Sequence, residues 1–176
     1  MQQDSMRVAM VLARNYEDIE ATSPKDFLEA HGATVTVIGV EMGDIVGKKG
    51  GSLPAGTTFA DVRPDQFDML VIPGGGAPEN LRIVDAAVAF TLDFMASGPP
   101  VEAIFHGQQL LISAKALEGR KLTSVNKIRD DIINAGGTYV DEALVIDGNL
   151  ITSRVPDDLP VFNQALVDAL HPARVR

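Results

Sequence analysis

Residues 101–111, VEAIFHGQQLL, decide the fold class because they join a short apolar strand to a helix with almost no loop between them. Residues 101–105 are predicted to form a buried strand, and residues 107–117 a helix that follows at once. This is the strand–turn–helix pattern of a nucleophile elbow, in which one residue is exposed on a strained turn at the top of a sheet. The elbow residue here is Phe105, which has no nucleophilic atom.

Other short apolar runs surround this stretch. Residues 7–13 (RVAMVLA) form a continuous apolar run, which is typical of a strand covered on both faces. The β-branched run 34–40 predicts a second strand, and residues 67–72 (FDMLVI) predict a third, buried strand. Helices are predicted at 84–97, 126–135 and 157–170, and from Ser23-Pro24 to Gly32, because Ser and Pro favour a helix start and Gly a helix end.

Two segments predict small hairpins or loops. Residues 43–56 hold several glycines, and Asp147-Gly148-Asn149 is a tight-turn signal between two short strands within residues 144–151. Strands and helices thus alternate along the chain, which predicts an α/β layered fold with a mainly parallel sheet. With no internal repeat and no linker, residues 1–176 are interpreted as one domain.

The composition excludes several classes of function. The chain has 176 residues, with 15 Lys and Arg against 24 Asp and Glu, a net charge of −9 that argues against a nucleic-acid partner. Cysteine is absent, so disulfides, thiolate zinc sites and a cysteine nucleophile are all excluded. The three histidines lack metal-ligand spacing, and we expect neither a metal nor another cofactor. No apolar run approaches the roughly 20 residues that span a bilayer, and we expect a soluble, cytoplasmic protein without a membrane partner.

Ligands of such sheets bind beyond the carboxyl ends of the strands, where three loops are unusual. The first carries Glu17, Asp18 and Glu20, and we expect Glu17 and Asp18 to be solvated loop charges. The second, residues 73–79 (PGGGAPE), is either an anion-binding backbone loop or a plain strand-to-helix turn. The third carries His106, which taken alone fits a structural histidine as well as a catalytic one.

Several of these stretches together resemble the DJ-1/PfpI family, most closely its PfpI-like branch. The resemblance spans about residues 6–170 and rests on six segments in the right order: 17–20 (EDIE), 73–82 (PGGGAPENLR), 103–111 (AIFHGQQLL), 117–121 (LEGRK), 129–136 (RDDIINAG) and 147–154 (DGNLITSR). It implies a flavodoxin-like three-layer sandwich and a homodimer or higher oligomer. The activities of the family include intracellular proteolysis, glyoxalase or deglycase chemistry, and chaperone or stress roles, so the resemblance implies a small carbonyl or peptide substrate.

The elbow of the family reads Ala-Ile-Cys-His-Gly, so the resemblance places its cysteine at Phe105 and its histidine at His106. The carboxylate that hydrogen-bonds the family cysteine falls on Glu20. The glutamate that completes a triad across a subunit boundary falls on Glu79.

The backbone donors of the oxyanion site of the family fall on Gly74 and Gly75. Gln108 stands where the family usually has proline.

The main hypothesis is a stress-associated PfpI/DJ-1-like protein that lacks the catalytic cysteine and has no covalent hydrolase activity. One alternative is a hydrolase or a glyoxalase- or deglycase-like enzyme in which His106 and Glu79 act as general base without a cysteine. Another is a holdase-type chaperone, which a large exposed apolar patch would favour.

Two local expectations follow for the elbow. We expect Phe105 to keep the strained, positive-φ backbone of an elbow, with its ring in the former active-site pocket near Glu20 and the Gly74 and Gly75 amides. Without a thiol partner, Glu20 must be solvated, protonated or hydrogen-bonded elsewhere, because an unpaired buried polar group costs about 1–3 kcal/mol.

Overall fold

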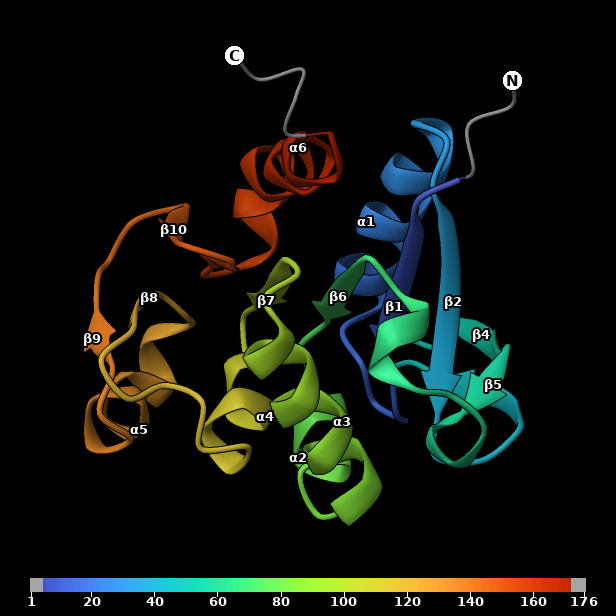
Figure 1. The fold of residues 1–176 in the computed structure, drawn as a ribbon, viewed down its shortest axis with the longest axis horizontal. Helices are drawn as coiled ribbons and strands as arrows, with labels where there is room; N and C mark the ends of the chain where they lie inside the picture. Colours follow the sequence, from blue (N-terminus) through green and yellow to red (C-terminus); the bar gives the residue numbers. More distant parts are fainter. Residues whose placement is uncertain (1–4, 172–176) are drawn as a thin grey trace.

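A computed structural model describes residues 5–171 of the chain, and a seven-stranded, mainly parallel sheet forms its centre (Figure 1). The strand order is β10-β11-β7-β6-β1-β2-β5, and only the pairing of β10 with β11 is antiparallel. The strands are β1 (Arg7–Val11), β2 (Thr34–Gly39), β5 (Thr57–Thr58), β6 (Met69–Ile72), β7 (Val101–Ile104), β10 (Val145–Asp147) and β11 (Leu150–Ser153).

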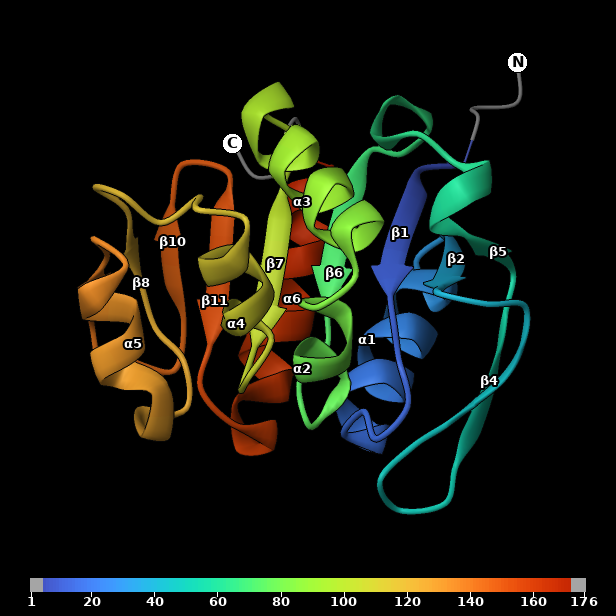
Figure 2. The same ribbon diagram turned by 90° about the horizontal axis from the view of Figure 1, so that it is seen from below.

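Helices cover both faces of this sheet (Figures 1 and 2). On one face α1 (Asp18–Ala30) packs beside α6 (Leu159–Leu170). On the other face lie α2 (Ala77–Leu81), α3 (Asp85–Ser97) and α4 (Gln108–Ser113), with α5 (Arg129–Asn134) next to α4. The predicted α/β fold, a flavodoxin-like three-layer sandwich, is confirmed.

Several short strands and 3-10 helices lie outside the main strands and helices. A hairpin joins β3 (Gly43–Val46) to β4 (Ser52–Ala55), as residues 43–56 predicted, and β8 (Lys121–Leu122) pairs with β9 (Thr138–Tyr139). The antiparallel pair β10–β11 confirms the turn predicted at residues 147–149. The short elements β5, β8, β9 and α2 were not predicted. Single-turn 3-10 helices lie at Phe59–Asp61, Pro64–Gln66, Asn126–Ile128 and Pro156–Asp158.

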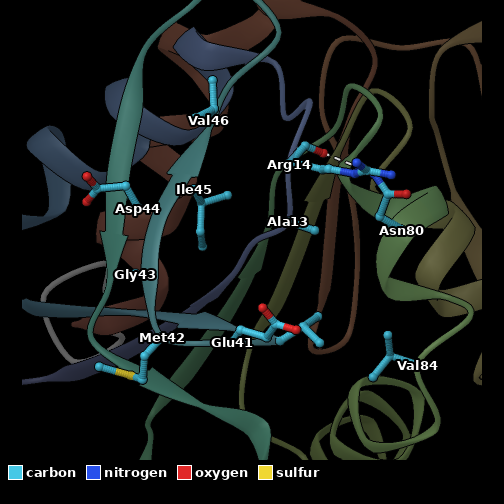
Figure 3. Close-up of a pocket in the computed structure, with 11 residues that line it drawn as sticks. Ala13, Arg14, Glu41, Met42, Gly43, Asp44, Ile45, Val46, Asn80 and Val84 are labelled. Atoms are coloured by element: carbon cyan, nitrogen blue, oxygen red, sulfur yellow. Dashed lines mark hydrogen bonds between the residues drawn. The ribbon is translucent and has the colours of Figure 1, made fainter.

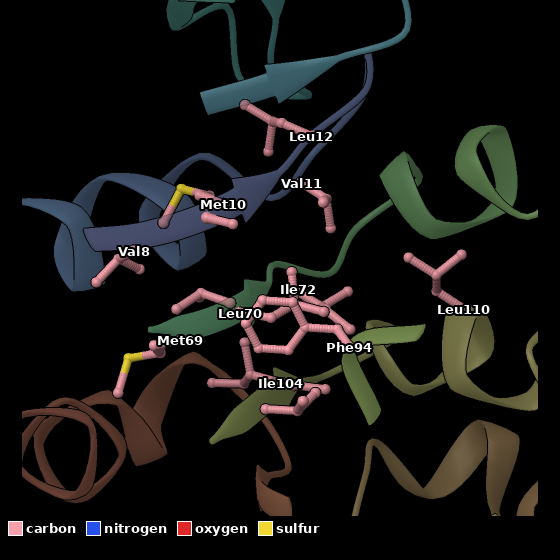
Figure 4. Packing of buried hydrophobic residues seen from close by; sticks show 14 of the residues in the cluster. Val8, Met10, Val11, Leu12, Met69, Leu70, Ile72, Phe94, Ile104 and Leu110 are labelled. Atoms are coloured by element: carbon pink, nitrogen blue, oxygen red, sulfur yellow. The ribbon is translucent and has the colours of Figure 1, made fainter. Parts of the chain in front are cut away.

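The central strands are buried on both faces, which explains their continuous apolar sequences. Met10 of β1, Leu70 and Ile72 of β6, Ile104 of β7 and Phe94 of α3 have no exposed surface and belong to one core cluster (Figure 4). This close-packed centre provides a rigid base for the loops at the carboxyl ends of β1, β6 and β7.

The predicted start of the first helix is wrong. α1 begins at Asp18, so Pro24 lies inside the helix rather than in its first turn. The Asp18 carboxylate accepts the backbone N–H groups of Lys49 and Gly51, both at 2.8 Å, which fixes the chain at the earlier start. The Ser23 hydroxyl does not cap the helix but accepts a hydrogen bond from Asn163 of α6.

The helix after the elbow is shorter than the predicted range of 107–117. It ends at Ser113, because Lys115 takes a left-handed conformation with φ +55°. The N–H groups of Lys115 and Ala116 donate to the carbonyls of Ile112 and Leu111, which is the Schellman pattern of a helix end.

Candidate active site

The strand order brings three loops together at one edge of the sheet. β1, β6 and β7 are neighbours and parallel, so the loops that follow them, residues 12–17, 73–76 and 105–107, converge beyond their carboxyl ends. The first two loops are linked directly, since the Glu17 N–H donates to the Gly74 carbonyl at 3.1 Å. The prediction that these loops lie at the carboxyl ends of strands is therefore confirmed.

Phe105 has the backbone of an elbow, with φ +66°, as predicted. Its N–H donates to Ser153 at the end of β11 (3.3 Å), and its carbonyl accepts the N–H of Val125 (3.1 Å). A Cβ on Gly107 would overlap the Ile72 carbonyl oxygen, so only glycine fits at that position. The turn is thus dictated by the elements around it, which hold a bulky residue in a region of φ that costs about 1–3 kcal/mol.

The Phe105 ring is half-buried and packs against the hydrophobic core. It also lies edge-on to the His106 ring, with the two ring centres 4.4 Å apart. Its placement beside Glu20 stays a prediction.

Glu20 lies on the first turn of α1 and is fully buried. Its Oε1 accepts the N–H of Gly74 at 2.9 Å, while Oε2 has no hydrogen-bond partner. Burial raises the pKa of Glu20 to about 8, although the Gly74 N–H acts in the opposite direction. Glu20 therefore accepts a hydrogen bond on one oxygen and is protonated at neutral pH. Of the three outcomes expected for it, hydrogen bonding elsewhere and protonation both occur, and exposure to solvent does not.

The hydrogen bond to Glu20 occupies one of the two expected oxyanion donors, the Gly74 N–H. Within residues 5–171, the N–H groups of Gly75 and His106 donate no intramolecular hydrogen bond. Gly75 has φ +77°, and a side chain there would overlap the backbone of Tyr16 and Glu17. The His106 N–H was not predicted as an oxyanion donor. Its position directly after the elbow residue is the sequence signal for such a donor.

His106 is half-buried, and its Nδ1 is buried without a hydrogen-bond partner. Burial lowers the pKa of His106, the charge of Glu79 opposes this shift, and the charges of Lys127 and Lys48 reinforce it. Neutral imidazole, the form that can accept a proton, is therefore favoured at neutral pH. Glu79 itself is exposed on α2.

The expectation for Glu17 is wrong, because this carboxylate is buried, with a relative exposure of 4%. It pairs with the ammonium groups of Lys49 (2.9 Å) and Lys48 (3.7 Å). The Asp18 carboxylate accepts backbone N–H groups of the same loop, residues 47–51. Ion pairs with a loop far along the chain thus accompany the burial of Glu17, whereas Asp18 stays partly exposed and is held by backbone N–H groups of the same loop.

Two further structural findings concern residues 5–171. They contain no group of three or more His, Cys, Asp or Glu side chains arranged to hold a metal ion. None of the helices in this part of the chain combines the length and apolarity needed to cross a bilayer.

Known proteins are similar in sequence to nearly the whole chain. The protein named Deglycase PfpI from Pyrococcus furiosus is 43% identical over 165 residues, which cover 94% of this chain and 99% of that protein. An uncharacterized protein from Archaeoglobus fulgidus is 46% identical over 165 residues, covering 94% and 98%.

Solved structures are similar as well. A two-domain protein from Anabaena variabilis with DJ-1/ThiJ/PfpI-like and ferritin-like domains matches with a TM-score of 0.93 and 40% identity, over 94% of this chain and 48% of that one. Drosophila melanogaster DJ-1beta matches with a TM-score of 0.89 and 28% identity, over 95% and 91%. The model of the DJ-1/PfpI family matches residues 6–169, and the chain therefore belongs to the DJ-1/PfpI family.

Proposed function

We propose that this chain is a DJ-1/PfpI protein that lacks the family nucleophile and performs no covalent hydrolysis or deglycation. The observation that carries the proposal is Phe105 at the elbow with φ +66°. The backbone retains the geometry that aims a nucleophile out of the sheet, but a phenyl ring has no lone pair with which to attack a carbonyl. The chain has no cysteine elsewhere that could take over this role.

The environment of Glu20 supports the same proposal. A carboxyl group beside a thiol has a partner with which to share a proton, whereas Oε2 of Glu20 is buried without a partner. Such an orphaned oxygen costs about 1–3 kcal/mol. A site shaped for a reactive thiol but occupied by Phe105 accounts for this cost.

A second candidate is a hydrolase or a glyoxalase- or deglycase-like enzyme without a covalent intermediate. It is favoured by the neutral, half-buried His106 and by the open N–H groups of Gly75 and His106. Its chemistry would be proton abstraction from water by His106, assisted by Glu79, with the two N–H groups at the developing oxyanion. General-base assistance supplies about 10²–10⁴-fold. Several relatives are named deglycases, which makes carbonyl adducts the first substrates to test.

The deciding experiment measures loss of methylglyoxal and hydrolysis of a peptide by the native chain and by Phe105→Cys. We expect the native chain to be inactive and the variant to gain activity. Methylglyoxal also reacts with free thiols, so Lys115→Cys is the matched control, because Lys115 is exposed and has a similar φ of +55°. Activity in Phe105→Cys but not in Lys115→Cys supports the proposal.

Native activity that disappears in His106→Ala would instead establish the second candidate. Native activity that survives His106→Ala would exclude both.

We further propose that the chain acts in the cytoplasm as a stress-associated homodimer or higher oligomer, in which Glu79 of one subunit approaches His106 of its neighbour. The exposure of Glu79, which leaves its carboxylate accessible to a neighbouring subunit, supports this. Light scattering should give at least twice the 18.7 kDa chain mass at micromolar concentration. A stable monomer would contradict the shared site.

A further inference from the structure

A cavity lies at the carboxyl edge of the sheet, away from the elbow. It has a volume of about 580 Å³, which is within the range of small-molecule sites. Its walls come from the segments that follow β1 and β2, from β3, from α2 and from the residue before α3, and they include neither Phe105 nor His106. The position fits the general rule that α/β sheets bind ligands beyond the carboxyl ends of their strands.

Charges of opposite sign lie at the two ends of this cavity. Figure 3 shows Arg14 and Asn80 at one end and Glu41 at the other. The Asn80 side chain is held by the Arg14 carbonyl, to which its Nδ2 donates at 3.1 Å. Among residues 5–171, neither the Arg14 guanidinium nor the Glu41 carboxylate forms a salt bridge. Both charges are therefore available to a ligand.

The middle of the cavity is apolar. Ala13, Ile45 and Val84 line the space between the charged ends in Figure 3. Met42 lies at the rim with 64% of its surface exposed, which is high for a large apolar side chain. The Asp44 carboxylate points away from this space (Figure 3), so the acidic end is formed by Glu41.

We propose that this cavity binds a small aliphatic molecule with a carboxylate at one end and an ammonium group at the other. Arg14 and the Asn80 amide would bind the carboxylate, Glu41 the ammonium, and Ile45 and Val84 the aliphatic chain. A ligand with a single charge leaves one end of the cavity without a partner. The site is independent of the chemistry proposed at the elbow.

The test compares three probes of similar length by ligand-observed NMR: 6-aminohexanoate, hexanoate and hexylammonium. Exposed ion pairs are individually weak, so each additional charged end should tighten binding by about two- to fivefold at low salt. 6-Aminohexanoate should therefore bind more tightly than either other probe, and its advantage should shrink as the salt concentration rises.

Variants assign each end separately. Arg14→Gln should remove the advantage of 6-aminohexanoate over hexylammonium, and Glu41→Gln should remove its advantage over hexanoate. Asp44→Asn is the matched control and should leave both advantages unchanged, because its carboxylate points away from the cavity. Ile45→Ser should weaken all three probes to a similar extent.

Equal binding of the three probes, or no binding of any probe, would overturn the proposal. An unchanged preference in both Arg14→Gln and Glu41→Gln would do the same. None of these outcomes depends on activity at Phe105, so the failure of this proposal and of the proposed function are distinguishable.

Discussion

The Gly74 N–H donates a hydrogen bond of 2.9 Å to the buried Glu20 carboxyl, and this contact joins the loop after β6 to the start of α1. Because burial outweighs this bond, the pKa of Glu20 is raised to about 8 from its ordinary value of 4.5. Below pH 4.5 Glu20 is protonated in both the folded and the unfolded chain and has no effect on the pH dependence of stability. Between about pH 4.5 and 8 the unfolded chain releases this proton while the folded chain keeps it.

The free energy of unfolding should therefore fall as the pH rises from about 5 to 8, and the contribution of Glu20 should level off above pH 8. One pKa unit corresponds to about 1.4 kcal/mol, so the decrease is on the order of a few kcal/mol. Glu20→Gln keeps an acceptor for Gly74 but cannot ionise, and should make the pH profile of stability, measured by urea unfolding, less steep. A profile as steep as that of the native chain would show that Glu20 is ionised in the folded protein.

A second buried acid, Glu102, lies in the middle of β7 between Val71 and Ile151. Neither carboxylate oxygen has a hydrogen-bond partner, and burial raises the pKa of Glu102 well above its usual value. Glu102→Met, of similar length but apolar, should stabilise the protein by about 1–3 kcal/mol at pH 7, since it removes the cost of an orphaned acid.

Glu102→Gln is the control for this prediction. Its amide is also polar and would be buried in the same place, so the gain in stability should be smaller than in the methionine variant. A loss of stability in Glu102→Met would mean that the acid has a compensating partner, such as a buried water molecule.

Gln108 connects three segments of backbone near the elbow. Its Nε2 lies 2.7 Å from the carbonyl of Thr123, 3.2 Å from that of Ser153 and 3.3 Å from that of Ala103. Gln108→Ala would remove this donor from all three carbonyls, of which that of Ser153 keeps the Phe105 N–H, and should destabilise the chain by about 1–3 kcal/mol. Gln164→Ala, which removes an exposed contact with Asp168 one helical turn away, should cost less than about 0.5 kcal/mol. Similar losses in the two variants, measured by thermal or urea unfolding, would refute the connecting role.

The sequence predicted the features that depend on local pattern and backbone stereochemistry. The apolar runs of β1, β6 and β7 and the strand–turn–helix at Phe105 are local patterns, and the structure contains them. The features that the sequence could not predict depend on contacts between residues far apart in the chain. Glu17 is buried because Lys48 and Lys49 reach it from another loop, and the Gly74 N–H is occupied because Glu20 lies below it.

The start of α1 was missed for the same reason. Asp18 is fixed by the N–H groups of Lys49 and Gly51, more than 30 residues away, and these contacts override the local preference of Ser23-Pro24 for a helix start.

The left-handed backbone of Lys115 offers a direct measure of strain at a helix end. Lys115 occupies the position after the α4 cap at which glycine is the usual residue, and its φ of +55° crowds its Cβ against the backbone. Its side chain is exposed and forms no salt bridge within residues 5–171, so its removal costs little. Lys115→Gly should stabilise the protein by about 0.5–1 kcal/mol, because relief of strain exceeds the greater entropy that glycine gives the unfolded chain. Lys115→Ala removes the same charge but keeps the Cβ, and it should bring no such gain in urea unfolding. If both variants gained equal stability, removal of the charge and not relief of backbone strain would be the source of the effect.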